Sequence, residues 1–316
     1  MKRILFLLTA LFFVPPVWAQ NQTASTQAPE PYKPISVIVP ERALSAGDRE
    51  LIQHAAPTEP IVKPKKERKI LLFSLNVDYP GHRSVICASE AFKIIGQKTK
   101  AFTAVNSYDP NVFLPEYLYA YDAVVFNNGI GNLFSDPYVR ELLEAFVKNG
   151  GGLLGIHGAT DAFVHYGGDQ KGEDDWPLFG EMLGARGTKH RESNERVFIK
   201  IDDPDHPLTQ GFPKQGFDYT DEILRVTDPF SRTKVRVLLS VDNGKSDLFR
   251  APYQNVKERD DEDYALAWVK RFGEGRVCYC AIGHSPKVFW DPMMLRFYLA
   301  AAQFVLGDLD GPAEPL

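Results

Sequence analysis

From residue 69 onward, short apolar runs alternate with segments whose apolar residues recur at helical spacing. Four of these runs have the length and continuity of strands buried on both faces: 70–75, 102–107, 121–127 and 153–156. Helical spacing is found over 84–97, and the pair Asp136-Pro137 opens a second helix that ends near Lys148. Strands and helices that alternate over such short connections predict parallel βαβ units with right-handed crossovers.

The pattern changes after Gly184, where strands follow one another with fewer helices between them. We assign the later strands to 196–201, 235–241, 265–269 and 276–282. The last two are separated by the turn 272–275, which favours a hairpin, and a closing helix covers 293–305. The predicted fold class is therefore α/β: a doubly wound, mostly parallel sheet sandwiched by helices.

The N-terminal segment has the pattern of a secretory signal. Lys2 and Arg3 precede an apolar stretch over 4–14 and the small-residue site that ends at Ala19. We expect 1–19 to be a signal peptide and the protein to be exported, periplasmic or extracellular; the alternative is an uncleaved anchor. The apolar stretch is shorter than the roughly 20 residues of a membrane span, and we expect no span in the mature protein.

Residues 20–68 are expected to form a disordered leader that contains one short helix over 48–56, with Ser45 as its candidate cap. The basic run 63–68 is interpreted as a solvated tether, and the sequence leaves open whether the leader contacts the rest of the chain. One α/β domain is expected over 69–309, followed by a tail over 310–316. A net charge of −5 with mixed signs argues against a nucleic-acid partner.

Three cysteines are too few for a disulfide framework. Cys278 and Cys280 lie two apart on one predicted strand, so their side chains point the same way and are unsuited to bridging each other. We interpret these two and Cys87 as small core residues. A bridge from Cys87 to either of the other two stays open.

Candidate chemistry is concentrated where the predicted strands end, which is where open α/β sheets bind ligands. Three of the seven histidines lie at such positions. The candidates that follow strands are His82, Asn128, His157, Asp161 and His284.

His157 has a special setting, because Gly155-Ile156-His157-Gly158-Ala159 resembles the sharp turn that presents a nucleophile above a sheet. A histidine in place of Ser or Cys excludes acyl-transfer chemistry and favours acid–base catalysis or metal ligation. The alternative is a histidine that only hydrogen-bonds the facing loops. No local metal-ligand spacing occurs, so a metal site would have to assemble from distant loops.

Further candidates lie outside the strand ends. Glu222 follows Asp221 at the start of an apolar run, so one of these two carboxylates is expected to point inward and to need a cation or metal. His190 is a weaker candidate, and His206 is interpreted as a turn residue. Several aromatic residues are candidates for stacking on sugar rings, with a core position as the alternative: Tyr79, Phe163, Tyr166, Trp176 and Trp290.

Several motifs in this order resemble the ThuA-like (trehalose utilisation) family. They are the glycine-rich strand and turn 150–161, and the shorter motifs 205–209, 221–223, 267–269, 275–277, 283–286 and 290–292. The resemblance implies a class I glutamine amidotransferase-like, flavodoxin-like fold in which His157 fills the catalytic Cys position. It also implies a link to trehalose-type disaccharides and their 3-keto-glycoside derivatives. The order Gly81-His82-Arg83 departs from the Arg-His order common in the family.

Two functional hypotheses follow. The first is an exported carbohydrate-active hydrolase, lyase or isomerase, not a glutamine amidotransferase, with a small carbohydrate as its partner. His157 and His284 would be base and acid, or ligands of a divalent metal such as zinc, and Glu222 and Asp161 would assist them. The residues assigned to substrate binding are His82, Asn128, Trp176, His190 and Trp290. The second hypothesis is a non-catalytic sugar-binding or accessory domain. The oligomeric state is left open.

Overall fold

A nine-stranded mixed sheet forms the centre of the domain in the computed structural model, which describes residues 44–164, 175–246 and 259–316. In spatial order its strands are β2 (Thr103–Ser107), β1 (Lys69–Phe73), β3 (Ala123–Asn127), β4 (Gly152–Ile156), β11 (Gly275–Cys280), β10 (Ala265–Phe272), β9 (Arg236–Val241), β6 (Glu195–Ile201) and β7 (Phe217–Asp221). A separate two-stranded ribbon pairs β5 (Arg186–Lys189) with β8 (Arg225–Thr227).

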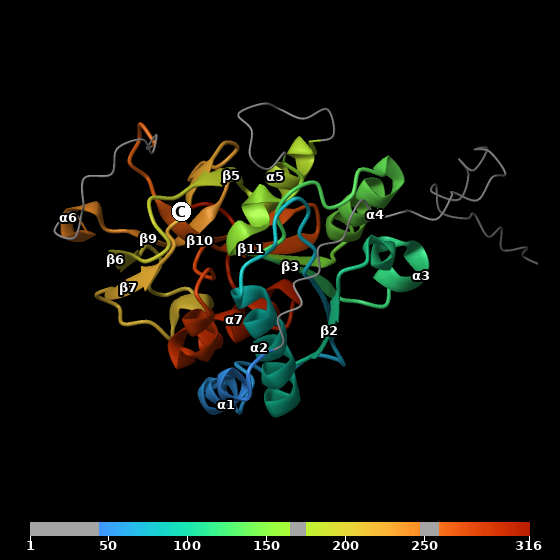
Figure 1. Cartoon of the computed structure of the whole chain (residues 1–316), viewed down its shortest axis with the longest axis horizontal. Coiled ribbons are helices and arrows are strands. Elements are labelled where there is room, and N and C mark those ends of the chain that lie inside the picture. The colour runs from blue at the N-terminus through green and yellow to red at the C-terminus, as the bar shows by residue number, and fades with distance from the viewer. Residues whose placement is uncertain (1–43, 165–174, 247–258) are drawn as a thin grey trace, which may run out of the picture. The chain divides into compact units, whose positions relative to one another are not determined.

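Helices cover both faces of the sheet, which confirms the predicted α/β class. Figure 1 shows α1, α2 and α7 on one side and α4 and α5 on the other. The helices are α1 (Ala46–Ala55), α2 (Ser84–Thr99), α3 (Pro115–Leu118), α4 (Pro137–Lys148), α5 (Pro177–Leu183), α6 (Asn243–Ser246) and α7 (Pro292–Val305). Short 3₁₀ helices add η2 (Pro110–Phe113), η3 (His157–Asp161), η4 (Pro207–Thr209) and η6 (Pro286–Trp290).

The sheet has a parallel half and an antiparallel half. β2, β1, β3, β4 and β11 are parallel neighbours, in the strand order of flavodoxin-like folds. β11 and β10 form the predicted hairpin, and β9, β6 and β7 continue the sheet with antiparallel pairing. Alternation places β9 and β7 in the same direction as the parallel half, so only β10 and β6 of this sheet run the other way.

Three strands have no counterpart in the sequence-based assignment, namely β5, β7 and β8. β5 and β8 have only four and three residues, too few to show a period. β7 is an edge strand whose side chains alternate between exposed and half-buried positions up to Asp221, so it lacks a continuous apolar run.

The described part of the leader, residues 44–68, lies against the domain. Ser45 caps α1 by accepting a hydrogen bond from Asp48 N (3.0 Å), as its position predicts. Further along, Gln303 of α7 accepts from the backbone of Ile61 (2.8 Å) and donates to Val62 O (2.7 Å). These contacts answer the question of docking that the sequence left open.

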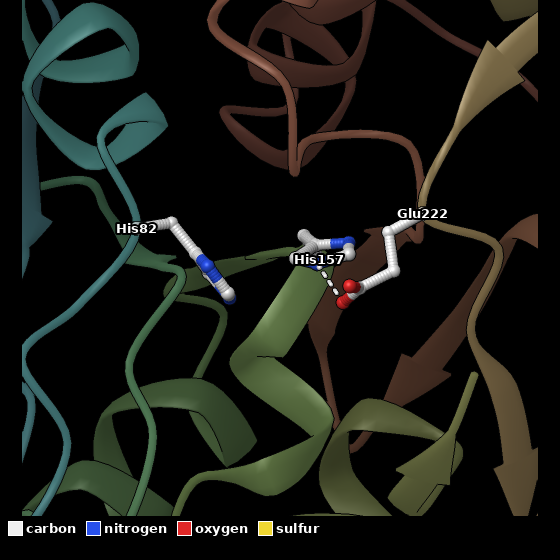
Figure 2. A group of neighbouring side chains, drawn as sticks. All are labelled: His82, His157 and Glu222. Carbon is white, nitrogen blue, oxygen red and sulfur yellow. Dashed lines mark ion pairs between the residues drawn. The ribbon is translucent and has the colours of Figure 1, made fainter. Parts of the chain in front are cut away.

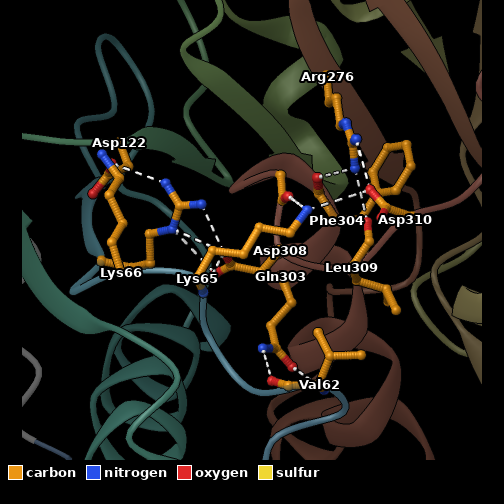
Figure 3. A network of polar contacts seen from close by, with 12 residues as sticks. Val62, Lys65, Lys66, Asp122, Arg276, Gln303, Phe304, Asp308, Leu309 and Asp310 are labelled. Atoms are coloured by element: carbon orange, nitrogen blue, oxygen red, sulfur yellow. Dashed lines mark hydrogen bonds and ion pairs between the residues drawn. The ribbon is translucent and has the colours of Figure 1, made fainter.

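The basic run 63–68 differs from the solvated tether expected of it, because Lys65, Lys66 and Arg68 pair with carboxylates that precede β3 or follow α7 (Figure 3). Arg68 binds Asp308 (2.6 Å) and Asp122 (3.2 Å), and its side chain is only 10% exposed. Lys66 also pairs with Asp122, at 2.6 Å. The tail is anchored as well, since His206 Nε2 donates to Pro312 O (3.0 Å).

The three cysteines are buried and unbridged, in agreement with their interpretation as core residues. The predicted signal 1–19, the first part of the leader and Tyr166 lie outside the described residues. None of the helices within 44–164, 175–246 and 259–316 combines the length and the apolar character needed to cross a bilayer.

Candidate metal and acid–base site

Polar side chains gather at the carboxyl-terminal edge of the sheet. His82 follows β1, His157 follows β4, His284 follows β11 and Glu222 follows β7. Figure 2 shows His82, His157 and Glu222 converging from three separate segments. The parallel direction of these strands explains the convergence, because it brings their ends to one edge.

His157 occupies the sharp turn that the sequence predicts. Its φ of 46° lies in the left-handed region, which is unfavourable for a residue with a Cβ. Two hydrogen bonds hold it there: Tyr279 Oη donates to His157 O (2.7 Å), and the ring Nδ1 lies 2.6 Å from Ala281 O. Because a carbonyl only accepts, Nδ1 carries the proton, and Nε2 faces the site.

Glu222 lies at the centre of the group. Its Oε1 is 3.3 Å from His157 Nε2. Its other oxygen, Oε2, accepts a hydrogen bond from Ser193 Oγ (3.1 Å) and lies 3.3 Å from His190 Nδ1 and 3.6 Å from His284 Nε2. Thus Oε2 is engaged by neighbouring side chains, whereas Oε1 points toward the buried part of the site.

His82 lies in the loop after β1. Together with His157 and Glu222 it forms what we call the inner group. Its Nδ1 lies 2.9 Å from Tyr79 Oη, which leaves Nε2 for the site. The His82 ring centroid is 5.3 Å from that of His157 and 4.6 Å from that of His284. Three histidine rings therefore lie in mutual contact, with Glu222 as the nearby anion.

This crowding separates the pKa values of the four groups. Burial, together with the neighbouring His157 and His284, lowers the pKa of His82 to about 3. Burial lowers the pKa of His284 in the same way. For His157 burial acts in that direction too, but the Glu222 and Asp221 carboxylates outweigh it and raise its pKa above 6.5. Burial opposes ionisation of Glu222, yet its bond to His157 lowers the Glu222 pKa to about 2.

The inner group has the donor set of a metal site. One ligand atom each from His82, His157 and Glu222 lies within 4.8 Å of the others. The protonated Nδ1 of His157 directs the Nε2 lone pair at an ionised carboxylate oxygen, an arrangement that requires either a second proton or a cation between them. Two histidines and one glutamate are a ligand set of catalytic zinc, with a further position for water or substrate.

The structure brings together five of the residues singled out in the sequence: His82, His157, His190, Glu222 and His284. Asn128 is buried, and its Oδ1 lies 3.5 Å from Gly158 N. Asp161 ends η3, where its backbone carbonyl accepts from Gly131 N (3.0 Å).

The aromatic candidates are dispersed. Trp176 is 9% exposed and its ring packs edge-on against Phe163 at 5.0 Å, which favours a core role for both. Trp290 ends η6, which packs against α1 and α2. Tyr79 lies beside His82 and contacts it by hydrogen bonding, a role that stacking arguments do not predict. Ser193 was missed altogether, since a lone serine in a polar loop carries no distinguishing pattern.

The comparisons with known proteins agree with this architecture. A ThuA-like protein from Bacteroides uniformis has a similar structure, with a TM-score of 0.58 and 21% identity over 77% of this chain and 93% of that one. A second, from Parabacteroides merdae, has a TM-score of 0.52 and 16% identity over 78% and 93%. None of the curated proteins matches the chain. The family model described as "ThuA: Trehalose utilisation" matches residues 69–305, and the chain therefore belongs to the ThuA family.

Proposed function

We propose that this protein is a metal-dependent enzyme of carbohydrate metabolism that acts on a trehalose-type disaccharide or its 3-keto derivative. The observation that carries the proposal is the inner group: His82, His157 and Glu222 offer three ligand atoms within 4.8 Å of one another at the ligand-binding edge of the sheet. The family description, trehalose utilisation, supports the substrate class.

The chain's own residues would prepare this site for a divalent cation such as zinc. Tyr79 and Ala281 O occupy the outer nitrogens of His82 and His157, so that each ring presents Nε2 inward. A bound cation would supply Lewis acidity toward a sugar carbonyl oxygen or lower the pKa of a bound water. Glu222 contributes the only carboxylate of the inner group, and its second oxygen accepts a hydrogen bond from Ser193.

His284 is the residue best placed to move a proton. Its side chain is 22% exposed and that of His157 is 1% exposed, so His284 lies nearer the solvent from which a sugar would enter. Because its pKa is lowered, the ring is neutral at pH 7 and can accept a proton. In a 3-keto-glycoside the acidic proton lies on the carbon beside the ketone, and His284 would be the base that removes it.

Metal content and activity test the proposal together. The full chain is purified without chelator beside His157→Ala and the control His54→Ala, which changes an exposed residue of α1. Elemental mass spectrometry should find close to one divalent ion per chain in the parent and the control and none in His157→Ala. Turnover of trehalose and 3-keto-trehalose should fall by about 100-fold or more in His157→Ala.

Two results would overturn the proposal. A parent protein that turns over a 3-keto-glycoside equally well after complete removal of metal would exclude the metal-dependent reaction. A protein that binds these sugars without converting them, and whose affinity survives His157→Gln, would instead be the non-catalytic sugar-binding domain.

A further inference from the structure

Asp221, the residue before Glu222, is a fully buried carboxylate with three backbone partners. Its Oδ2 accepts from Gly283 N (2.8 Å) and His284 N (3.1 Å), and its Oδ1 accepts from Ser285 N (2.8 Å). An ionised carboxylate accepts several hydrogen bonds and donates none. It therefore matches a loop whose consecutive N–H groups all point to one place.

These bonds join two segments that the sheet does not pair. Asp221 ends β7 at the edge of the sheet, whereas 283–285 follow β11 near its middle, with β10, β9 and β6 between the two strands. Glu222 leaves β7 immediately after this attachment, and its Oε2 lies 3.6 Å from His284 Nε2. The attachment thus coincides with the place where the two segments contribute side chains to the site.

We propose that Asp221 is the positioning residue of the site, and that its three hydrogen bonds set Glu222 and His284 relative to each other. The step from this geometry to metal affinity rests on the proposed function. The positions of Glu222 and His284 are set by these hydrogen bonds in the metal-free protein as well. His284 is placed through its own backbone N–H, and Glu222 through its peptide link to Asp221.

Asp221→Asn keeps the size of the side chain but removes the match between two acceptor oxygens and three backbone N–H donors. One of the two acceptor oxygens becomes an NH₂ group, which would point at backbone donors. At least one N–H of 283–285 then loses its partner, and the loop is held less tightly to the end of β7. Asp218→Asn is the matched control, because Asp218 lies on the same strand, exposed, and its 2.8 Å ion pair with Arg196 is at the surface.

Two measurements use the metal-free full chain. Amide hydrogen exchange should be at least tenfold faster at 283–285 in Asp221→Asn than in the parent, with no such change in β4. In spectra of protein labelled with ¹⁵N-histidine, the ring signal that disappears in His284→Gln should shift in Asp221→Asn. The signal of His206, whose partners are Pro312 and Leu208, should not move.

The third measurement is zinc affinity by competition with a chromophoric chelator. Loss of a residue that orients metal ligands typically costs about 10- to 100-fold, and we expect that loss in Asp221→Asn but not in Asp218→Asn. Unchanged exchange and an unchanged His284 signal would overturn the proposal, as would zinc affinity equal to that of the parent despite both changes. If the parent binds no zinc, the metal-dependent function fails, while the two metal-free measurements still decide the positioning role.

Discussion

His157 shows how a single residue can be prepared for one chemical role. The left-handed backbone and the bond from Nδ1–H to Ala281 O fix both the direction of the ring and its tautomer. Tyr279 holds the carbonyl of the same residue. The ring can therefore neither rotate nor exchange its nitrogens without breaking a buried hydrogen bond, which is costly. Such fixation is what an efficient ligand or proton carrier requires.

His82 should make the metal-free protein sensitive to acid. Its pKa is about 3 in the folded state and 6.5 without the fold, so between these values the unfolded chain binds a proton that the folded chain does not. The contribution of His82 to the free energy of unfolding therefore falls as the pH drops from 6.5 toward 3. Allowing for solvent screening of a half-buried ring, we expect a loss of about 1 kcal/mol between pH 7 and pH 5.

Urea unfolding of the metal-free parent and of His82→Gln at both pH values measures this loss, with His54→Gln as the control. The variant should lose less stability than the parent on acidification. Equal losses of stability in the parent and in His82→Gln would show that folding does not lower the pKa of His82.

Some site residues can be predicted from the sequence and others cannot, for physical reasons. His157 and His284 follow buried strands, and strand ends are visible in an apolar pattern. Glu222 was indicated by a carboxylate next to an apolar run, although Asp221 and Glu222 both prove to be buried. The contacts of Ser193 and His190 with Glu222 depend on how a polar loop folds back over the site, and no local pattern encodes that path.

At the scale of elements, three loops meet at Gly131. Gly131 N binds Asp161 O (3.0 Å), Phe163 N binds Gly131 O (2.8 Å), and Val77 N binds Ile130 O (2.9 Å). The loops after β1, β3 and β4 are thereby held together below the site. A Cβ at Gly131 would lie 2.3 Å from Val77 O, and its φ is +87°.

Gly131→Ala should therefore displace the loop that carries His82. Gly307→Ala is a matched control, because Gly307 also has a positive φ (+77°) but no atom within 4 Å of a Cβ. The strain of a positive φ costs about 1 kcal/mol in either variant, so the excess loss at Gly131 measures the steric contact. We expect that excess to be about 1–3 kcal/mol in urea unfolding. Equal losses in the two variants would contradict the close approach of the loops.

At the scale of the whole molecule, the parallel half of the sheet can be predicted from the sequence. The attachment of the edge strand β7 to the loop after β11 cannot. β1, β3 and β4 are buried on both faces, so each leaves a continuous apolar run. The edge strand β7 leaves none, and its attachment to the loop after β11 joins residues more than 60 positions apart. The docking of 61–68 on α7 is non-local in the same way, since it depends on single polar side chains such as Gln303 and Asp308.

The most direct test of a metal site at His82, His157 and Glu222 is to locate the metal. Crystals of the full chain grown with zinc would be measured on both sides of the zinc absorption edge. We predict one strong anomalous peak about 2.0–2.2 Å from a ring nitrogen of His82, a ring nitrogen of His157 and an oxygen of Glu222. Zinc bound elsewhere on the protein, with no anomalous density between these three side chains, would contradict the central claim.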